Sequence, residues 1–191
     1  AIVFMLIYRL SEAMLVKLAS PFMLDARSEG GLGLSPEAVG VVYGTVGIIA
    51  LIVGGILGGI AISRWGLRRC LMPMALALTL PNLVYVYMAL WQPTSLVLIN
   101  GAVAAEQFGY GFGFTAYMMY LIRFSEGEYK TSHYAICSGF MALGMMLPGM
   151  AAGWIQTTLG SYLSFFIFVV ICILPTIAIV PLCLLYTSPS P

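Results

Sequence analysis

Residues 35–62 read SPEAVGVVYGTVGIIALIVGGILGGIAI, and a basic cluster follows them at Arg64, Arg68 and Arg69. Ser35 can cap a helix and Pro36 suits the first helical position, so a helix is expected to begin here. After Glu37 no charged residue appears before residue 64. Because a bilayer-spanning helix needs about 20 predominantly apolar residues, the stretch predicts a transmembrane helix that ends at a basic loop.

The composition of the whole chain agrees with this segment. Of its 191 residues, 61% are hydrophobic and 8% are charged, whereas soluble domains carry about 25% charged residues. This balance excludes a water-soluble globular protein, a disordered chain and a nucleic-acid-binding protein. We therefore predict an all-α polytopic membrane protein with six transmembrane helices. The predicted ranges are Ile2–Met23, Pro36–Ile62, Cys70–Trp91, Ser95–Ile122, Tyr134–Gln156 and Tyr162–Leu185.

The basic residues of the loops predict how these helices are oriented. The loops after the second and fourth helices hold five of them, Arg64, Arg68, Arg69, Arg123 and Lys130. The loops after the first, third and fifth helices hold one, Arg27. Since cytoplasmic loops carry an excess of Lys and Arg, the first set is predicted to lie in the cytoplasm, together with both ends of the chain.

Charged residues also occur inside two of the predicted spans. The first span contains Arg9, Glu12 and Lys17, all on one half of the helix surface. A charge at the bilayer centre costs about 2.5–3.5 kcal/mol, so this face is expected to meet protein or water, and Arg9 and Glu12 can pair at i, i+3. In the fourth span Glu106 shares a face with Tyr110 and is expected to be either paired with the first span or protonated.

The sequence carries no motif of an intramembrane enzyme. It lacks H-E-x-x-H and a G-x-S-x-G turn, and its four cysteines show no metal-ligand spacing. We therefore expect neither enzymatic activity nor a metal or cofactor. In a secondary transporter, polar groups lie on corresponding helices of two three-helix repeats. The first and fourth spans are such a pair, and they hold the buried charges, which favours a transporter.

The end of the second predicted helix resembles a family signature. Residues 59–69 read GIAISRWGLRR. They are similar to the cytoplasmic loop of the major facilitator superfamily, in which Gly is followed after three residues by Asp, Arg, any residue, Gly and basic residues. Ser63 stands where Asp is usual.

Further segments resemble the C-terminal half of AmpG-like muropeptide permeases, in the same order. They are YRLSEA at residues 8–13, EAVGVV at 37–42, Glu106-Gln107 leading into Gly111 and Gly113, and AGW at 152–154. The resemblance implies that residues 1–182 form the C-terminal six-helix half of a twelve-helix transporter whose N-terminal half is missing. Residues 183–191 are expected to be a non-native or disordered tail.

The resemblance also implies an activity. It points to a proton-coupled secondary transporter of the bacterial inner membrane that imports peptidoglycan fragments, with a small and anionic solute and protons as partners. Gly44 and Met145 stand where enterobacterial permeases have Lys and Arg. An oligosaccharide or another organic anion therefore stays open as the solute, as does a six-helix channel or packing protein without coupled transport.

The candidate functional residues fall into three groups. Arg9 and Lys17 are expected to hold an anionic group of the solute, and Glu12 or Glu106 is expected to be the proton-coupling carboxylate. The full set of substrate-binding candidates is Arg9, Lys17, Asn100, Gln107, Tyr110 and Tyr117. The candidates for a cytoplasmic gate are Arg64, Gly66, Arg68 and Arg69.

The predicted orientation can be tested by labelling single cysteines with a membrane-impermeant thiol reagent. We expect Ser28→Cys and Pro93→Cys to be labelled from the periplasm, and Gly66→Cys and Gly127→Cys from the cytoplasm, because the basic loops stay inside. Labelling from the opposite sides would invert the orientation.

Overall fold

The computed structural model describes residues 2–186, and side chains as far as Pro181. Every regular element in this part of the chain is helical. The longer elements are α1 Ile2–Ile7, α2 Leu10–Leu24, α3 Pro36–Val41, the π-helical turn η2 Val42–Gly47, α4 Ile48–Trp65, α5 Leu67–Thr79, α6 Leu83–Trp91, α7 Leu96–Phe124, α8 Lys130–Leu159, α9 Tyr162–Ile171 and α10 Ile173–Tyr186. The short 3-10 turns are η1 Arg27–Glu29 and η3 Leu80–Asn82.

The predicted all-helical architecture is confirmed. Four continuous helical stretches are long and apolar enough to cross a membrane, namely Pro36–Trp65, Leu67–Trp91, Lys130–Leu159 and Tyr162–Pro181. The other two predicted spans are also helical, but they hold the buried charges, and the first is interrupted between α1 and α2. The tail beginning at residue 183 stays a prediction, because α10 continues to Tyr186 and residues 187–191 lie outside the described part.

The interruption of the first span lies at Tyr8 and Arg9. Arg9 precedes α2 with a φ of −109° and a ψ of 16°, away from helical values. The helical hydrogen bonds close on either side, from the Tyr8 amide to the Phe4 carbonyl at 2.9 Å and from the Ala13 amide to the Arg9 carbonyl at 2.8 Å. Because of this break, the direction of the Arg9 side chain does not follow the helical spacing of the α2 residues after it.

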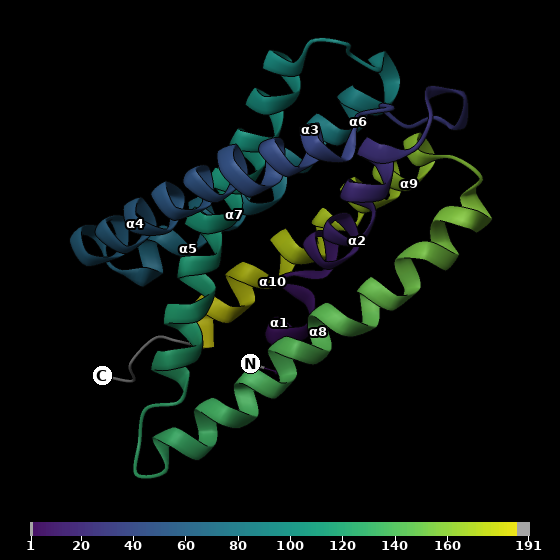
Figure 1. Ribbon diagram of the computed structural model, residues 1–191. Helices are drawn as coiled ribbons and strands as arrows, with labels where there is room; N and C mark the ends of the chain where they lie inside the picture. The colour runs from purple at the N-terminus through teal and green to yellow at the C-terminus, as the bar shows by residue number, and fades with distance from the viewer. Residues whose placement is uncertain (1, 187–191) are drawn as a thin grey trace.

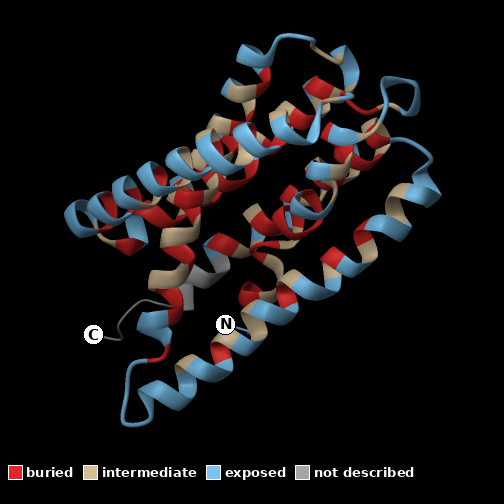
Figure 2. Ribbon diagram, viewed as in Figure 1, coloured by how far each residue is buried: buried red, intermediate tan, exposed pale blue. Residues whose placement is uncertain are grey.

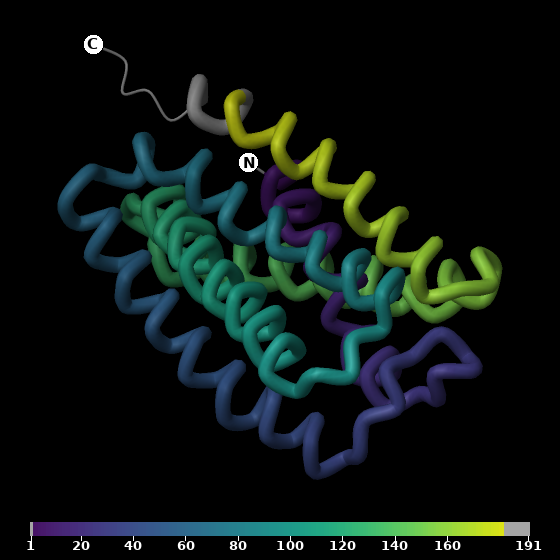
Figure 3. Tube along the Cα trace, turned by 90° about the horizontal axis from the view of Figure 1, so that it is seen from above, coloured from purple at the N-terminus to yellow at the C-terminus, as the bar shows by residue number. Residues whose placement is uncertain are grey.

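Helix α7 lies between α4 on one side and α5 on the other (Figure 3). Glycines make this approach possible. A Cβ added to Gly111 would lie 2.1 Å from the Leu51 carbonyl oxygen of α4, and one added to Gly54 would lie 2.2 Å from the Phe108 carbonyl oxygen of α7. These are contacts between backbones, which only residues without a side chain allow.

The opposite side of α7 meets α5 in the same way. A Cβ on Gly109 would lie 2.0 Å from the Ala77 carbonyl oxygen, and one on Gly113 would lie 2.5 Å from that of Met74. Small residues on both faces of one helix therefore hold α4, α7 and α5 in a closely packed layer. This layer positions the polar side chains of α7.

The loops are sorted to two ends of the molecule (Figure 1). The α4–α5 and α7–α8 connections lie at one end, and the helix ends beside them carry the five basic residues. The α2–α3, α6–α7 and α8–α9 connections lie at the other end. At this second end Arg27 donates to the carbonyl oxygens of Gln92 at 2.7 Å and Pro93 at 3.1 Å. Its charge thus stabilises the C-terminus of α6.

The outer faces of the molecule are apolar and exposed. Figure 2 shows exposed residues along much of α4 and α8. In the most apolar stretch of Pro36–Trp65, which contains α4, only 28% of the residues are buried, and in that of α8 only 22% are buried. A water-soluble protein would have to cover such surface, whereas a bilayer or a second set of helices can contact it directly.

The packing of α7 gives a stability prediction. We expect Gly111→Ala to lower the unfolding midpoint in detergent, because its Cβ would meet the Leu51 carbonyl oxygen at 2.1 Å and overpacking costs about 1–3 kcal/mol. Gly59→Ala is the matched control, since its Cβ meets nothing within 4 Å and Ala favours a helix by about 1 kcal/mol over Gly. Equal midpoints for the two variants would contradict the proposed packing.

Candidate functional site

The structure separates the charged residues of the two polar spans. Arg9, Glu12 and Glu106 are 5%, 1% and 2% exposed, respectively, and are the buried charged side chains of the described chain. Lys17 is exposed on α2, and its stem packs over Gly149 of α8. The predicted charged face of the first span therefore divides, with Arg9 and Glu12 inside the helical bundle and Lys17 at its surface.

Arg9 binds aromatic side chains of α7. Its Nη2 donates to the Tyr110 hydroxyl at 2.5 Å. Its guanidinium carbon lies 4.7 Å from the ring centroid of Phe114 and 5.3 Å from that of Tyr110. These distances are within the range of cation–π interactions, so a hydroxyl and two rings stabilise the buried cation.

The expected pair between Arg9 and Glu12 does not form. Both Glu12 carboxylate oxygens are buried and have no hydrogen-bond partner among the described residues. The helix break explains this correction, since an i, i+3 pair needs both residues on one continuous helix and Arg9 precedes α2. The charges of Glu106 and Arg9 nevertheless both act on the Glu12 carboxylate.

Glu106 is held by neighbours other than the first span. Its Oε2 accepts hydrogen bonds from Gln107 Nε2 at 3.0 Å and from the Tyr85 hydroxyl of α6 at 3.5 Å. The Tyr85 hydroxyl in turn contacts the hydroxyl of Tyr43 in η2. The other carboxylate oxygen, Glu106 Oε1, is buried and has no hydrogen-bond partner in the described structure. Of the two expected states, the pair with the first span does not form, because α7 turns this side chain toward Tyr85 of α6. The protonated state of Glu106 stays a prediction.

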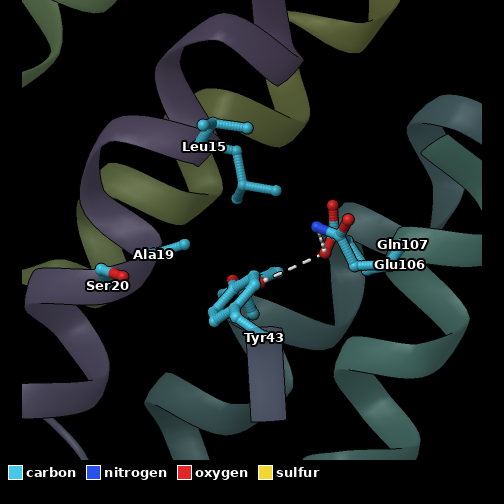
Figure 4. Close-up of a pocket in the computed structure, with 8 residues that line it drawn as sticks. Leu15, Ala19, Ser20, Tyr43, Glu106 and Gln107 are labelled. Carbon is cyan, nitrogen blue, oxygen red and sulfur yellow. Dashed lines mark hydrogen bonds between the residues drawn. The ribbon is translucent and has the colours of Figure 1, made fainter. Parts of the chain in front are cut away.

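A cavity of about 300 Å³ opens beside this carboxylate (Figure 4). Its polar wall is formed by Glu106, Gln107, Tyr43 and Tyr85, and α2 supplies the opposite wall, which includes Leu15. Side chains of four elements, α2, η2, α6 and α7, thus meet at one site.

Other predicted substrate-binding residues lie outside this cavity. The Tyr117 hydroxyl donates to the Met5 carbonyl oxygen at 2.8 Å, and its ring stacks on that of Tyr8 at 5.1 Å. Asn100 Nδ2 donates to the Leu96 carbonyl oxygen at 2.7 Å. Gln107 is the predicted substrate-binding residue that the structure places at the cavity.

The predicted gate residues gather at the α4–α5 connection. Arg64, Arg68 and Arg69 are exposed. Gly66 joins the two helices with a φ of +78°, a conformation that residues with a Cβ rarely adopt. This arrangement agrees with a basic loop at one end of the molecule, and its gating role stays a prediction.

Sequence reasoning missed Tyr43 and Tyr85. Both tyrosines lie in apolar runs, where a tyrosine usually packs as a core or interface residue. No clear sequence pattern predicts the π-helical turn that carries Tyr43, apart from Gly44 and Gly47 within it. Such turns are frequent at functional sites, but this one is visible only in the folded chain.

Comparisons with known proteins agree on one family. A family model described as Major Facilitator Superfamily matches residues 2–191. The anhydromuropeptide permease of Escherichia coli is 27% identical over 177 residues, which cover 93% of this chain and 35% of the permease. The putative transporter AmpG 4 of Rickettsia conorii is 28% identical over 172 residues, covering 90% of this chain and 40% of the transporter. The chain thus spans less than half the length of these relatives.

The contact between Arg9 and Tyr110 gives a second stability prediction. We expect Tyr110→Phe to lower the free energy of unfolding by about 1–3 kcal/mol, because a buried guanidinium would lose its hydrogen-bond acceptor. The ring contact with Arg9 would remain. Tyr87→Phe is the control, since Tyr87 is 44% exposed. If both variants unfold at the wild-type midpoint, the hydroxyl contributes no stability.

Proposed function

Because this chain belongs to the major facilitator superfamily, we propose that it is one six-helix half of a proton-coupled, twelve-helix solute importer. In this superfamily two six-helix halves are related by an axis along the membrane normal. The share of the relatives that the chain covers, 35% to 40%, supports one half. The exposed apolar faces of α4 and α8 support contact with lipid and a second half.

Proton coupling rests on one observation, the excess of buried carboxylates. Glu12 and Glu106 are both buried, and Arg9 is the buried cation near them among the described residues. With both carboxylates ionised, these groups leave one negative charge unbalanced inside the bundle. An unbalanced buried charge costs several kcal/mol, and binding of a proton removes this cost. We infer that Glu106 is the coupling group, because it lies at the cavity.

We infer the class of the solute from the names of the relatives. One of them is an anhydromuropeptide permease and another is called AmpG 4. We infer that the complete transporter imports peptidoglycan fragments across the bacterial inner membrane. An oligosaccharide or another organic anion is the alternative, since Gly44 and Met145 stand where enterobacterial permeases have Lys and Arg.

The coupling role can be tested in the complete transporter, reconstituted in liposomes with a labelled muropeptide. We expect Glu106→Gln to abolish the acceleration of uptake by a pH gradient and to preserve solute exchange at equal pH when the solute is saturating. Gln keeps the size of the side chain and most of its hydrogen bonds, but it cannot ionise. Glu37→Gln, at the exposed start of α3, is the matched control.

The unfolding midpoint separates a coupling defect from a folding defect. A Glu106→Gln variant that is stable and keeps its response to the pH gradient would remove Glu106 from the coupling step. Glu12 would then be the buried carboxylate to test.

A further inference from the structure

The cavity beside Glu106 has an unusual balance of charge for the site of an anionic solute. None of the described residues that line it is basic, and one, Glu106, is acidic. Arg9, the nearby buried cation, makes its hydrogen bond to Tyr110. The electrostatic character of the cavity is therefore set by a carboxylate and by neutral polar groups.

Most hydrogens of these polar groups are already used. The Tyr85 hydroxyl donates its one hydrogen to Glu106 Oε2, so in its contact with Tyr43 it accepts and Tyr43 donates. Gln107 Nε2 also donates to Glu106 Oε2. One hydrogen of Gln107 Nε2 remains, and the other free positions are acceptors, namely Glu106 Oε1, Gln107 Oε1 and the lone pairs of the Tyr43 oxygen.

One of these acceptors lacks a partner where a partner is expected. Glu106 is 2% exposed and its Oε1 has no hydrogen bond in the described structure. Leaving a buried acceptor without a donor costs about 1–3 kcal/mol, and more when the group is charged. A ligand that brings hydrogen-bond donors and positive charge would recover this free energy.

A protonated primary amine fits these requirements. It carries a positive charge and three donors, and tyrosine rings such as those of Tyr43 and Tyr85 favour cations near their faces. Leu15 and Ala19 on the α2 side can contact the alkyl chain next to the amine. The volume of about 300 Å³ is at the small end of ligand pockets, which suits one group of a larger solute.

We propose that the cavity between α2, η2, α6 and α7 is a subsite for a protonated primary amine of the transported solute. The neighbouring backbone supports a built site. A Cβ on Gly47 would lie 3.3 Å from the Gln107 Cγ, so glycine lets η2 approach α7. The π-helical turn places Tyr43 against Tyr85. The subsite depends on the proposed transport function for its use, but not for its binding chemistry.

Binding can be measured on the complete transporter in lipid nanodiscs, without transport. The probe is n-butylammonium at neutral pH, and 1-butanol and pentanoate are the neutral and anionic comparisons, all titrated by saturation-transfer NMR. We expect saturable binding of n-butylammonium alone. Glu106→Gln should weaken it by about tenfold or more, the factor for one charged hydrogen bond. Glu37→Gln should leave it unchanged.

A second variant covers the case in which Glu106→Gln does not fold. Ser20→Leu adds bulk at the α2 wall of the cavity and removes no charge, so it should also abolish saturable binding. Equal binding of 1-butanol, or unchanged binding of n-butylammonium by a folded Glu106→Gln or Ser20→Leu variant, would overturn the proposal.

The two experiments can overturn either proposal, proton coupling or the amine subsite, without overturning the other. Loss of the pH-gradient response in Glu106→Gln, together with no specific binding of n-butylammonium, would overturn the amine subsite and keep proton coupling. Specific binding together with an unchanged pH-gradient response would overturn proton coupling and keep the subsite.

Discussion

The close approach of α7 to α4 and α5 is the constraint on which the rest of the structure depends. Gly109 and Gly111 bring the α7 backbone against carbonyl oxygens on two sides. In a bilayer, where lipid and side chains are equally apolar, helices associate through packing and hydrogen bonds rather than through the hydrophobic effect. A methyl group at either glycine would separate the helices and move every polar side chain of α7.

Once α7 is fixed, its polar residues face two different neighbours. Tyr110 turns toward the break between α1 and α2, where it accepts from Arg9. Glu106 turns toward Tyr85 of α6 and the cavity. The buried positive and negative charges are consequently held by separate sets of partners, although Glu12 remains close enough to interact with both Arg9 and Glu106.

This separation connects the architecture with the proposed activity. A carboxylate paired with arginine would be neutralised permanently, whereas Glu106 Oε1 has no partner in the described structure. A group in that state can take a proton or a cationic group of a solute, and it can release either. Ion or proton coupling in a transporter requires such reversible binding within the membrane. The same feature underlies both proposals, and it lies where four elements meet.

The residue pattern predicts the helical segments, the basic loops on one side and the burial of Glu12 and Glu106. Hydropathy and loop charge act on each segment separately, because every span must satisfy the bilayer alone. The partners of these side chains follow from the tertiary structure: Arg9 binds Tyr110 rather than Glu12, Lys17 is exposed, and Tyr85, itself in contact with Tyr43, donates to Glu106. Those contacts depend on a helix break, a π-helical turn and the rotation of helices about one another. These are relations between distant segments, and residue spacing within one helix does not specify them.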